Sequence, residues 1–246
     1  MRALVTNDDG VHSQGLRVLA EAAAARGFEV TVVAPSFDAS GSSASMTAVA
    51  RDGRVVVDTV SGDGDTDVLG VQGPPAFIVR AAMFGAFGPP PDVVLSGVNR
   101  GLNTGRAILH SGTVGAALTA ATYGRSGLAI SAEVEDDETW VPDCPVVEDA
   151  VAWLAKAPEA TVLNVNLPAS GRGGRLEVRQ TRLAEAGTVQ GRVSEAGGGY
   201  VSVVFSDAEG RPAEGTDAAA LAAGYVSVTA IRAVIEDDSF CLDGRL

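Results

Sequence analysis

The sequence predicts an α/β protein with an open, mostly parallel sheet and helices on both faces. Two observations predict this class. Short apolar runs typical of strands alternate with helix-like segments from residue 3 to residue 168. The first three of them, a strand at 3–6, a helix at 14–26 and a strand at 29–35, form a βαβ unit, whose two strands should be parallel.

The same alternation continues along the chain. The further expected strands are short runs rich in β-branched and apolar residues, at 54–60, 67–72, 92–97, 128–133 and 161–168. The further expected helices have an apolar face or are apolar nearly all round, at 76–87, 113–124 and 144–156. Alternation of this kind places helices on both faces of one sheet.

The pattern changes after residue 169. Residues 175–183 and 200–207 alternate like antiparallel strands, which predicts a long protruding hairpin with a mobile tip between them. A short helix at 216–224, capped by Thr216, and a strand at 225–234 follow.

These changes suggest three parts. Residues 1–169 are expected to form the core that carries the functional site, and residues 170–215 an extended hairpin that contacts other subunits. Residues 216–246 are expected to return to the core or to a partner subunit.

Composition excludes several classes of protein. The chain has 246 residues, 46% of them hydrophobic, which is enough for a sizeable core. Its net charge of −13, from 31 acids and 18 bases, argues against binding to a nucleic-acid polymer. No signal-peptide core and no apolar run near the ~20 residues of a membrane span is present, so we expect a cytoplasmic protein without a membrane partner. Cys144 and Cys241 fit neither a metal motif nor a disulfide framework.

Polar residues gather where the expected strands end. In an open α/β sheet, ligands bind at the carboxyl ends of the parallel strands. The loops expected at this edge contain carboxylates, amides and hydroxyls, namely Asn7, Asp8, Asp9, Asp38, Ser40, Gly41, Ser96, Asn99, Asn103, Ser111, Gly112 and Thr113.

These hard oxygen ligands indicate a site for Mg²⁺, Mn²⁺ or Ca²⁺ rather than for zinc. Asp8 and Asp9 would repel each other without a cation, and a strand end allows both to approach one ion. The alternative is that Asp-Asp-Gly is turn chemistry only. The position of the pair at the expected sheet edge favours the metal site.

Ser111-Gly112-Thr113 directly precedes a helix of small residues. The free N–H groups of such a helix end can bind an anion, although an ordinary N-cap explains the same residues. Beside a cation the segment becomes a candidate phosphate cradle. His12 and His110 are the only histidines, and His110 is the better candidate for contacting a substrate.

Several segments together resemble the SurE family of phosphatases, also called 5′/3′-nucleotidases. They are LVTNDDG, VVAPSFDASGSSASMT, VVLSGVNRGLNTG, ILHSGTVGAA, LNVNLP and TDAAALAAGYVSVT, in the family's order over nearly the whole chain. The resemblance implies a Rossmann-like core and a metal-dependent phosphomonoesterase that hydrolyses nucleoside monophosphates or other small phosphomonoesters. It also implies a homodimer or homotetramer.

The resemblance assigns roles to residues by position. One divalent ion per subunit, Mg²⁺ or Mn²⁺, would be held by Asp8, Asp9, Ser40 and Asn99. Asp8 or Asp9 would orient the attacking water or accept its proton, and the residues do not decide which. The expected phosphate and substrate contacts are Asn7, Gly41, Asn103, His110, Ser111, Gly112 and Thr113.

The chain departs from the family's pattern in loops expected to face the ligand, which leaves the substrate preference open. These departures are Ser13, Gln14, Ala44, Pro74 and Phe77. None of them removes an expected metal ligand.

Three other functions compete. A haloacid-dehalogenase-type phosphatase needs Asp-x-Asp and a helper lysine, whereas this chain has Asn7-Asp8-Asp9 and its only lysine, Lys156, is expected inside a helix. A receiver-like signalling module needs a phospho-acceptor Asp after a central strand, where Ser96 and Asn99 stand instead. A degenerate, non-catalytic binder would explain the altered loops.

Overall fold

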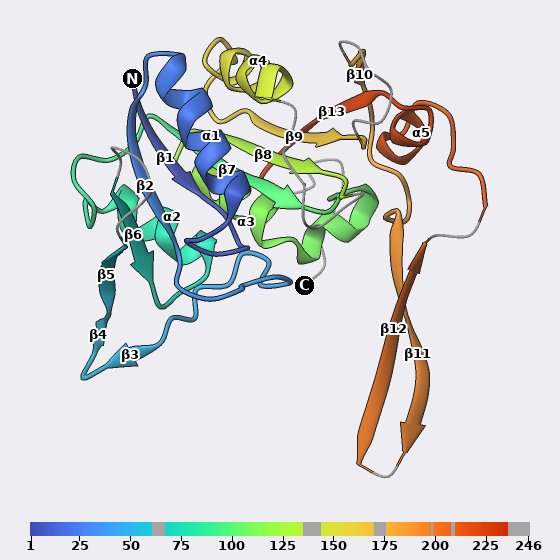
Figure 1. Ribbon diagram of the computed structural model, residues 1–246, viewed down its shortest axis with the longest axis horizontal. Helices are drawn as coiled ribbons and strands as arrows, with labels where there is room; N and C mark the ends of the chain where they lie inside the picture. Colours follow the sequence, from blue (N-terminus) through green and yellow to red (C-terminus); the bar gives the residue numbers. More distant parts are fainter. Residues whose placement is uncertain (61–66, 135–143, 170–175, 198, 208–209, 236–246) are drawn as a thin grey trace, which may run out of the picture.

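A nine-stranded sheet runs through the part of the chain that the computed structural model describes, namely residues 1–60, 67–134, 144–169, 176–197, 199–207 and 210–235 (Figure 1). Its strands, in spatial order, are β10 (Val178–Gln180), β13 (Val226–Ile231), β9 (Val162–Leu167), β8 (Ser126–Ala132), β7 (Val93–Arg100), β1 (Arg2–Thr6), β2 (Glu29–Pro35), β6 (Val68–Val71) and β5 (Val57–Val60). The strands from β9 to β6 are all parallel, and antiparallel pairing occurs where β13 meets β9 and where β5 meets β6. The predicted open, mostly parallel sheet is confirmed.

Helices cover both faces of this sheet, as the alternation predicted. They are α1 (Gln14–Ala25), α2 (Pro75–Met83), α3 (Gly112–Thr122) and α4 (Cys144–Leu154), with α5 (Asp217–Ala222) beside the β13 edge. Helices α1 and α4 pack on one face, over a core that includes Leu16, Leu19 and Leu154. Helices α2 and α3 pack on the other face, over Leu4, Val33 and Val94. Odd and even residues of β1 therefore belong to different cores, as the period of a strand requires.

The order of the strands reverses at β1. From β1 the chain adds β2 and then β6 on one side, and then β7, β8 and β9 on the other. Such a reversal separates the loops that leave the two neighbouring strands and creates a crevice at their carboxyl ends. The loops after β1 and β7 flank this crevice.

Several predicted elements have different bounds. The strand predicted at 54–60 is divided into β4 (Arg54–Val55), which pairs with β3 (Ala50–Arg51), and β5. Strand β7 continues three residues past its predicted end, and its register with β8 is irregular between Ser96 and Asn99. Helix α4 ends at Leu154, so Lys156 follows the helix rather than lying inside it.

The protruding hairpin exists, but its first strand is not the predicted one. It consists of β11 (Val189–Gly197) and β12 (Tyr200–Asp207), which pair antiparallel and extend away from the body (Figure 1). The predicted strand at 175–183 is reduced to β10, which joins the main sheet beside β13. The prediction was wrong because alternation shows that one face of a strand is buried, but not which strand is its partner. The predicted mobile tip at 184–199 mostly forms β11, and the end of the chain, 236–246, lies outside the described residues.

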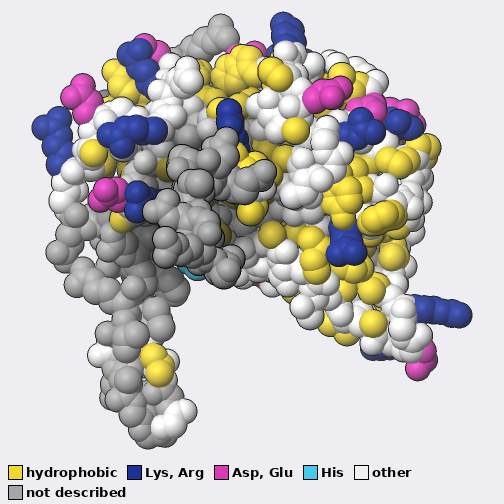
Figure 2. All heavy atoms as spheres, turned by 180° about the vertical axis from the view of Figure 1, so that it is seen from behind, with side chains coloured by type: hydrophobic (Ala, Val, Ile, Leu, Met, Phe, Trp, Pro, Cys, Tyr) yellow, Lys and Arg dark blue, Asp and Glu magenta, His cyan; other side chains and the backbone are white. Residues whose placement is uncertain are grey.

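Charged side chains of both signs are scattered over the face seen from behind, with hydrophobic side chains between them (Figure 2). Among the described helices, none is long and apolar enough to cross a membrane.

Candidate metal and phosphate site

Four segments meet at the carboxyl ends of the central strands. The backbone oxygen of Asp8, after β1, accepts from the N–H of Ala39, in the loop after β2, at 2.7 Å. The Asp8 carboxylate accepts from Thr113, at the start of α3. Asp9 accepts from the backbone N–H of Arg100, at the end of β7, at 3.3 Å. The adjacent acids therefore connect all of the loops that the sequence placed at this edge.

Asp8 is a buried carboxylate held by the amino end of α3. Its side chain is 3% exposed, and it accepts the Thr113 hydroxyl at 2.5 Å and the Thr113 backbone N–H at 3.1 Å. Burial raises the pKa of Asp8, and the hydrogen bonds from Thr113 and Gly112 oppose that rise. The positive end of the α3 dipole also favours the charged form. The helix end predicted to cradle a phosphate is thus occupied, at least at Thr113, by Asp8.

Gly112 allows this close contact. A Cβ atom at position 112 would lie 2.8 Å from Oδ2 of Asp8 and 2.7 Å from Oγ of Ser42. Only glycine lets both oxygens lie so close to this backbone. The preceding residue, Ser111, caps the helix, because its Oγ accepts from the N–H of Val114 at 3.1 Å.

Asp9 is the more accessible acid of the pair. Burial, followed by the neighbouring charge of Asp8 and a smaller contribution from Asp38, raises the pKa of Asp9 to about 6. The N–H of Arg100 acts in the opposite direction. Two carboxylates with raised pKa values at one sheet edge are arranged as a cation would require, since a nearby positive charge favours their ionised forms.

Ser40 and Asp38 form one unit beside Asp9. The Ser40 hydroxyl donates to Oδ1 of Asp38 at 2.6 Å, and the Ser40 backbone N–H donates to the same oxygen at 2.9 Å. These hydrogen bonds lower the pKa of Asp38. Asp38 was noted in the sequence but not assigned a role. Its spacing of two residues from Ser40, typical of an Asx turn, is the signal that could have identified it.

Asn99 directly precedes Arg100, whose backbone N–H donates to Asp9. Its side-chain nitrogen donates to the backbone oxygen of Gly101 at 2.7 Å, so its Oδ1 is the end that can ligate a cation. Asp9, Asp38, Ser40 and Asn99, together with Asp8, are called the acid edge below.

A polar network that the sequence did not reveal fixes Asn103. The Asn103 backbone oxygen accepts from the amides of Asn164 and Asn166 at 2.9 Å, and its N–H donates to Asn166 at 2.8 Å. Its side-chain nitrogen donates to Oγ of Ser131 at 2.8 Å. Both asparagines are in the LNVNLP segment of β9, where strand periodicity places them on one face, but only the fold shows what they contact.

The other predicted contacts have different surroundings. Asn7 is fully buried, and its amide both donates to and accepts from Gly10, so it shapes the turn after β1. His110 is exposed, and its backbone oxygen accepts from the N–H of Ser43 at 3.2 Å. Gly41 is exposed, with a φ of +74° that favours glycine.

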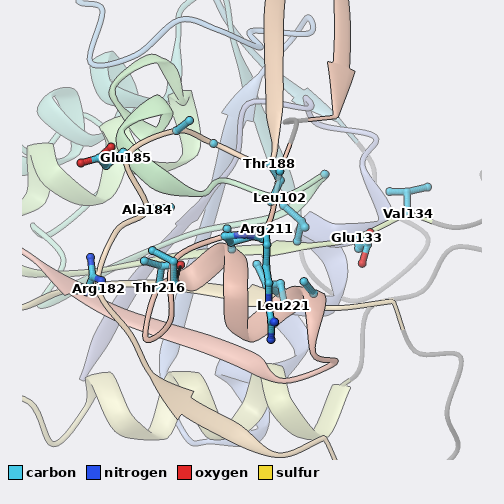
Figure 3. A pocket seen from close by; sticks show the side chains of 18 of the residues that line it. Leu102, Glu133, Val134, Arg182, Ala184, Glu185, Thr188, Arg211, Thr216 and Leu221 are labelled. Atoms are coloured by element: carbon cyan, nitrogen blue, oxygen red, sulfur yellow. Dashed lines mark hydrogen bonds between the residues drawn. The ribbon is translucent and has the colours of Figure 1, made fainter.

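A cavity of about 1250 Å³ opens beside the acid edge. Asp9, Asp38 and Ser40 line one end of it. Most of the remaining lining comes from residues 182–188, residues 210–213, Thr216 and α5, called the far wall below. Figure 3 shows Arg182, Arg211, Thr216 and Leu221 of this wall around the hollow, with Leu102 and Glu133 from the ends of the central strands.

The donor set suits a hard divalent cation. Within the described residues, no group of three or more His, Cys, Asp and Glu side chains is placed so that it could hold a metal ion, so a cation here would also need neutral oxygen ligands. Two adjacent carboxylates with a serine and an asparagine are oxygen donors, which leave positions for water and substrate on Mg²⁺ or Mn²⁺. The residues present therefore fit such an ion.

Comparison with known proteins gives a consistent result. The sequence model of a family described as "Survival protein SurE" matches residues 3–190. A protein of Rhodopseudomonas palustris (strain BisB18) named 5′-nucleotidase SurE is 36% identical, over 98% of this chain and 96% of its own length. A protein of the same name from Rhodopirellula baltica is 33% identical over 93% of this chain and 91% of its own length. The crystal structure of a SurE protein from Aquifex aeolicus superimposes with a TM-score of 0.72 at 29% identity, covering 97% of this chain and 96% of that one.

Proposed function

The chain belongs to the SurE family, and from this premise we propose that it is a metal-dependent phosphomonoesterase that hydrolyses nucleoside monophosphates. Relatives named 5′-nucleotidase that match almost end to end support the reaction class. The observation that carries the proposal is the Asp8–Asp9 pair at the point where the strand order reverses, with Ser40 and Asn99 on the adjacent loops.

We assign Asp8, Asp9, Ser40 and Asn99 as the residues that would hold one Mg²⁺ or Mn²⁺ ion. When bound, the ion lowers the pKa of an attacking water and neutralises charge on the phosphoryl oxygens. The environments of the two acids differ. Asp8 is buried and held by Thr113, whereas Asp9 lines the cavity and accepts one backbone N–H. We therefore propose that Asp8 anchors the ion and that Asp9 also orients the water.

The phosphate would lie between the acid edge and Asn103, and the nucleoside would point toward the far wall. Because Thr113 already bonds Asp8 and Ser111 caps α3, their role here is to position that helix and Asp8. Asn103 is held in place by its backbone, a form of preorganisation that favours binding of the transition state.

We also propose that the protein acts as a homodimer or homotetramer. The β11–β12 hairpin extends away from the body (Figure 1), and a lone two-stranded hairpin is marginally stable in water. A second copy that packs against it would stabilise it. Light scattering of the purified chain tests this part, and a monomeric mass at micromolar concentration would contradict it.

Phosphate release from a panel of 5′- and 3′-nucleoside monophosphates tests the function. The protein is assayed with EDTA, with Mg²⁺ and with Mn²⁺. We expect turnover with either metal and loss of turnover with EDTA. Hydrolysis that is unaffected by EDTA would refute the metal-dependent mechanism, and absence of hydrolysis with every metal would favour a non-catalytic nucleotide binder.

A further inference from the structure

Asp217, the first residue of α5, is a buried carboxylate outside the acid edge. Its side chain is 0% exposed. Oδ2 accepts from the N–H of Gly105 at 2.8 Å, whereas Oδ1 accepts from Ala184 at 2.9 Å and from Ala218 at 2.8 Å. One carboxylate therefore joins the loop after β7 to two parts of the far wall, residues 182–188 and α5, which are distant in the sequence.

These contacts join the far wall to the loop after β7, whose residues Gly101 and Leu102 line the cavity. Gly105 is two residues after Asn103, which we placed at the phosphate. Its φ is +57°, and a Cβ there would lie 2.3 Å from the backbone oxygen of Ala186, so loop and wall are in direct contact. Thr104 adds a parallel connection, because its Oγ1 accepts from the N–H of Thr188 at 2.9 Å.

We propose that Asp217 is a positioning residue for phosphomonoester hydrolysis. It fixes Gly105, and through Gly105 the position of Asn103, which we placed at the phosphate, and it fixes the far wall through Ala184. The inference rests on the proposed function. It explains why the TDAAALAAG segment has an acid directly after its capping threonine, although that acid is remote from the Asp8–Asp9 pair.

Position 217 requires a side chain that accepts hydrogen bonds through both of its end atoms and donates none. Three backbone N–H groups point at two carboxylate oxygens, and each buried N–H requires an acceptor. In D217N the size is kept, but the new NH₂ group faces at least one of these donors. The loop after β7 or the far wall must then move away from its present position.

Steady-state kinetics of D217N provide the first test. Thr229→Val is the matched control, since Thr229 is also a buried polar residue of the C-terminal segment and its hydroxyl bonds Thr181 at 2.7 Å, away from the cavity. Because displacement by about 1 Å can cost about 100-fold in rate, we expect kcat/KM of D217N to fall by about 10- to 100-fold, with a higher KM and a lower kcat. Mn²⁺ affinity measured without substrate should stay within about twofold of wild type, because Asp217 does not touch the acid edge.

Hydrogen exchange provides a second test that needs no activity. In the wild-type chain, the amides of Gly105 and Ala184 should exchange slowly, and in D217N exchange at 101–105 and 184–188 should accelerate by at least about tenfold relative to the Thr229→Val control. Fast exchange of both amides in wild type would overturn the proposal even if D217N does not fold. Kinetics and exchange of D217N that match those of the control would also overturn it.

The two tests separate this inference from the function on which it rests. If wild type hydrolyses none of the nucleotides and the exchange result is as expected, the proposed function fails, but the conclusion that Asp217 fixes Gly105 and Ala184 stands. If wild type is active and D217N is equally active, the function stands and the positioning role fails.

Discussion

The acid edge and the far wall contribute to the same cavity but are built differently. The acid edge is formed by loops of the first 113 residues, and its segments are joined largely by side chains, such as Asp8 to Thr113 and Asp9 to Arg100. The far wall is formed by residues 182–188, residues 210–213, Thr216 and α5, and much of it is joined by backbone pairs, such as the N–H of Arg106 with the oxygen of Ala184 at 3.1 Å. The candidate metal ligands are thus gathered in the acid edge, whereas the far wall provides a surface fixed largely by backbone contacts.

This difference predicts which kinetic constant each side controls. Side chains that act on the reacting phosphate should change kcat and metal affinity, whereas groups that contact only the remote part of a substrate should change KM. Variants on the two sides can break or sharpen this division.

The largest effect is expected from Asp9→Asn. The variant loses a charge that would hold the cation and orient the water, so phosphate release should fall by at least about 100-fold. Asp92→Asn is the control, since Asp92 is a surface acid that pairs with Arg2 and does not line the cavity. Near-normal turnover of Asp9→Asn with Mg²⁺ would contradict the expectation that side chains of the acid edge control kcat.

The pH dependence of the free energy of unfolding tests Asp9 without substrate. Its pKa of about 6 in the folded chain exceeds the ordinary value of 3.8, so the folded state binds the proton more tightly than the unfolded state. In EDTA, this contribution to stability is fully present below pH 3.8 and is lost as pH rises through about 6. We expect urea unfolding to show a loss of up to about 2 kcal/mol between pH 4 and 7, reduced by partial exposure of Asp9.

Asp9→Asn should remove that loss, because an amide does not titrate in this range. Added Mg²⁺ should stabilise wild type at pH 7 by mass action and stabilise the variant less. Equal pH profiles for wild type and variant would show that Asp9 is not the titrating group.

A smaller effect is expected from Thr113→Val, because Thr113 supports the acid edge only through its hydrogen bonds to Asp8. The change keeps the backbone N–H to Asp8 but removes the short hydroxyl bond. Loss of a hydrogen bond to a buried carboxylate costs about 1–3 kcal/mol, so we expect roughly that loss of unfolding free energy and about a tenfold loss of kcat/KM. Thr113→Ser restores the hydroxyl and should recover most of both. Equal values for the valine and serine variants would show that the hydroxyl has no role.

The same contrast explains what the sequence could predict. Asp8, Asp9, Ser40 and Asn99 could be placed at one edge, because loops that leave parallel neighbouring strands must meet there. The position of β10 and β11 could not be predicted, since a one-face alternation is the same in any sheet. The fold and its strand-end loops follow from local patterns, whereas the far wall depends on pairing between distant segments.

Roles at the site were harder to predict than membership in it. Thr113, for which a phosphate contact stays a prediction, donates to Asp8, a partner that the sequence did not indicate. A buried carboxylate is favoured at a helix amino end. Asn164 and Asn166 support Asn103 from β9, more than 60 residues further along the chain, and no local spacing indicates such a contact. Polar side chains in a short loop have many possible partners, and only tertiary packing selects among them.

The smallest effect is expected on the far wall, from Arg211→Gln. Arg211 lines the same cavity as Asp9, as part of the far wall, so in the proposed substrate position it would contact the nucleoside rather than the phosphate. Removal of its charge should weaken the binding of the substrate and of the transition state equally. We therefore expect KM to rise by about threefold and kcat to stay within about twofold of wild type. Arg80→Gln on α2 is the control, because Arg80 is exposed and does not line the cavity. A fall in kcat at unchanged KM would place Arg211 at the reacting phosphate. It would contradict the expectation that the acid edge controls kcat and the far wall controls KM.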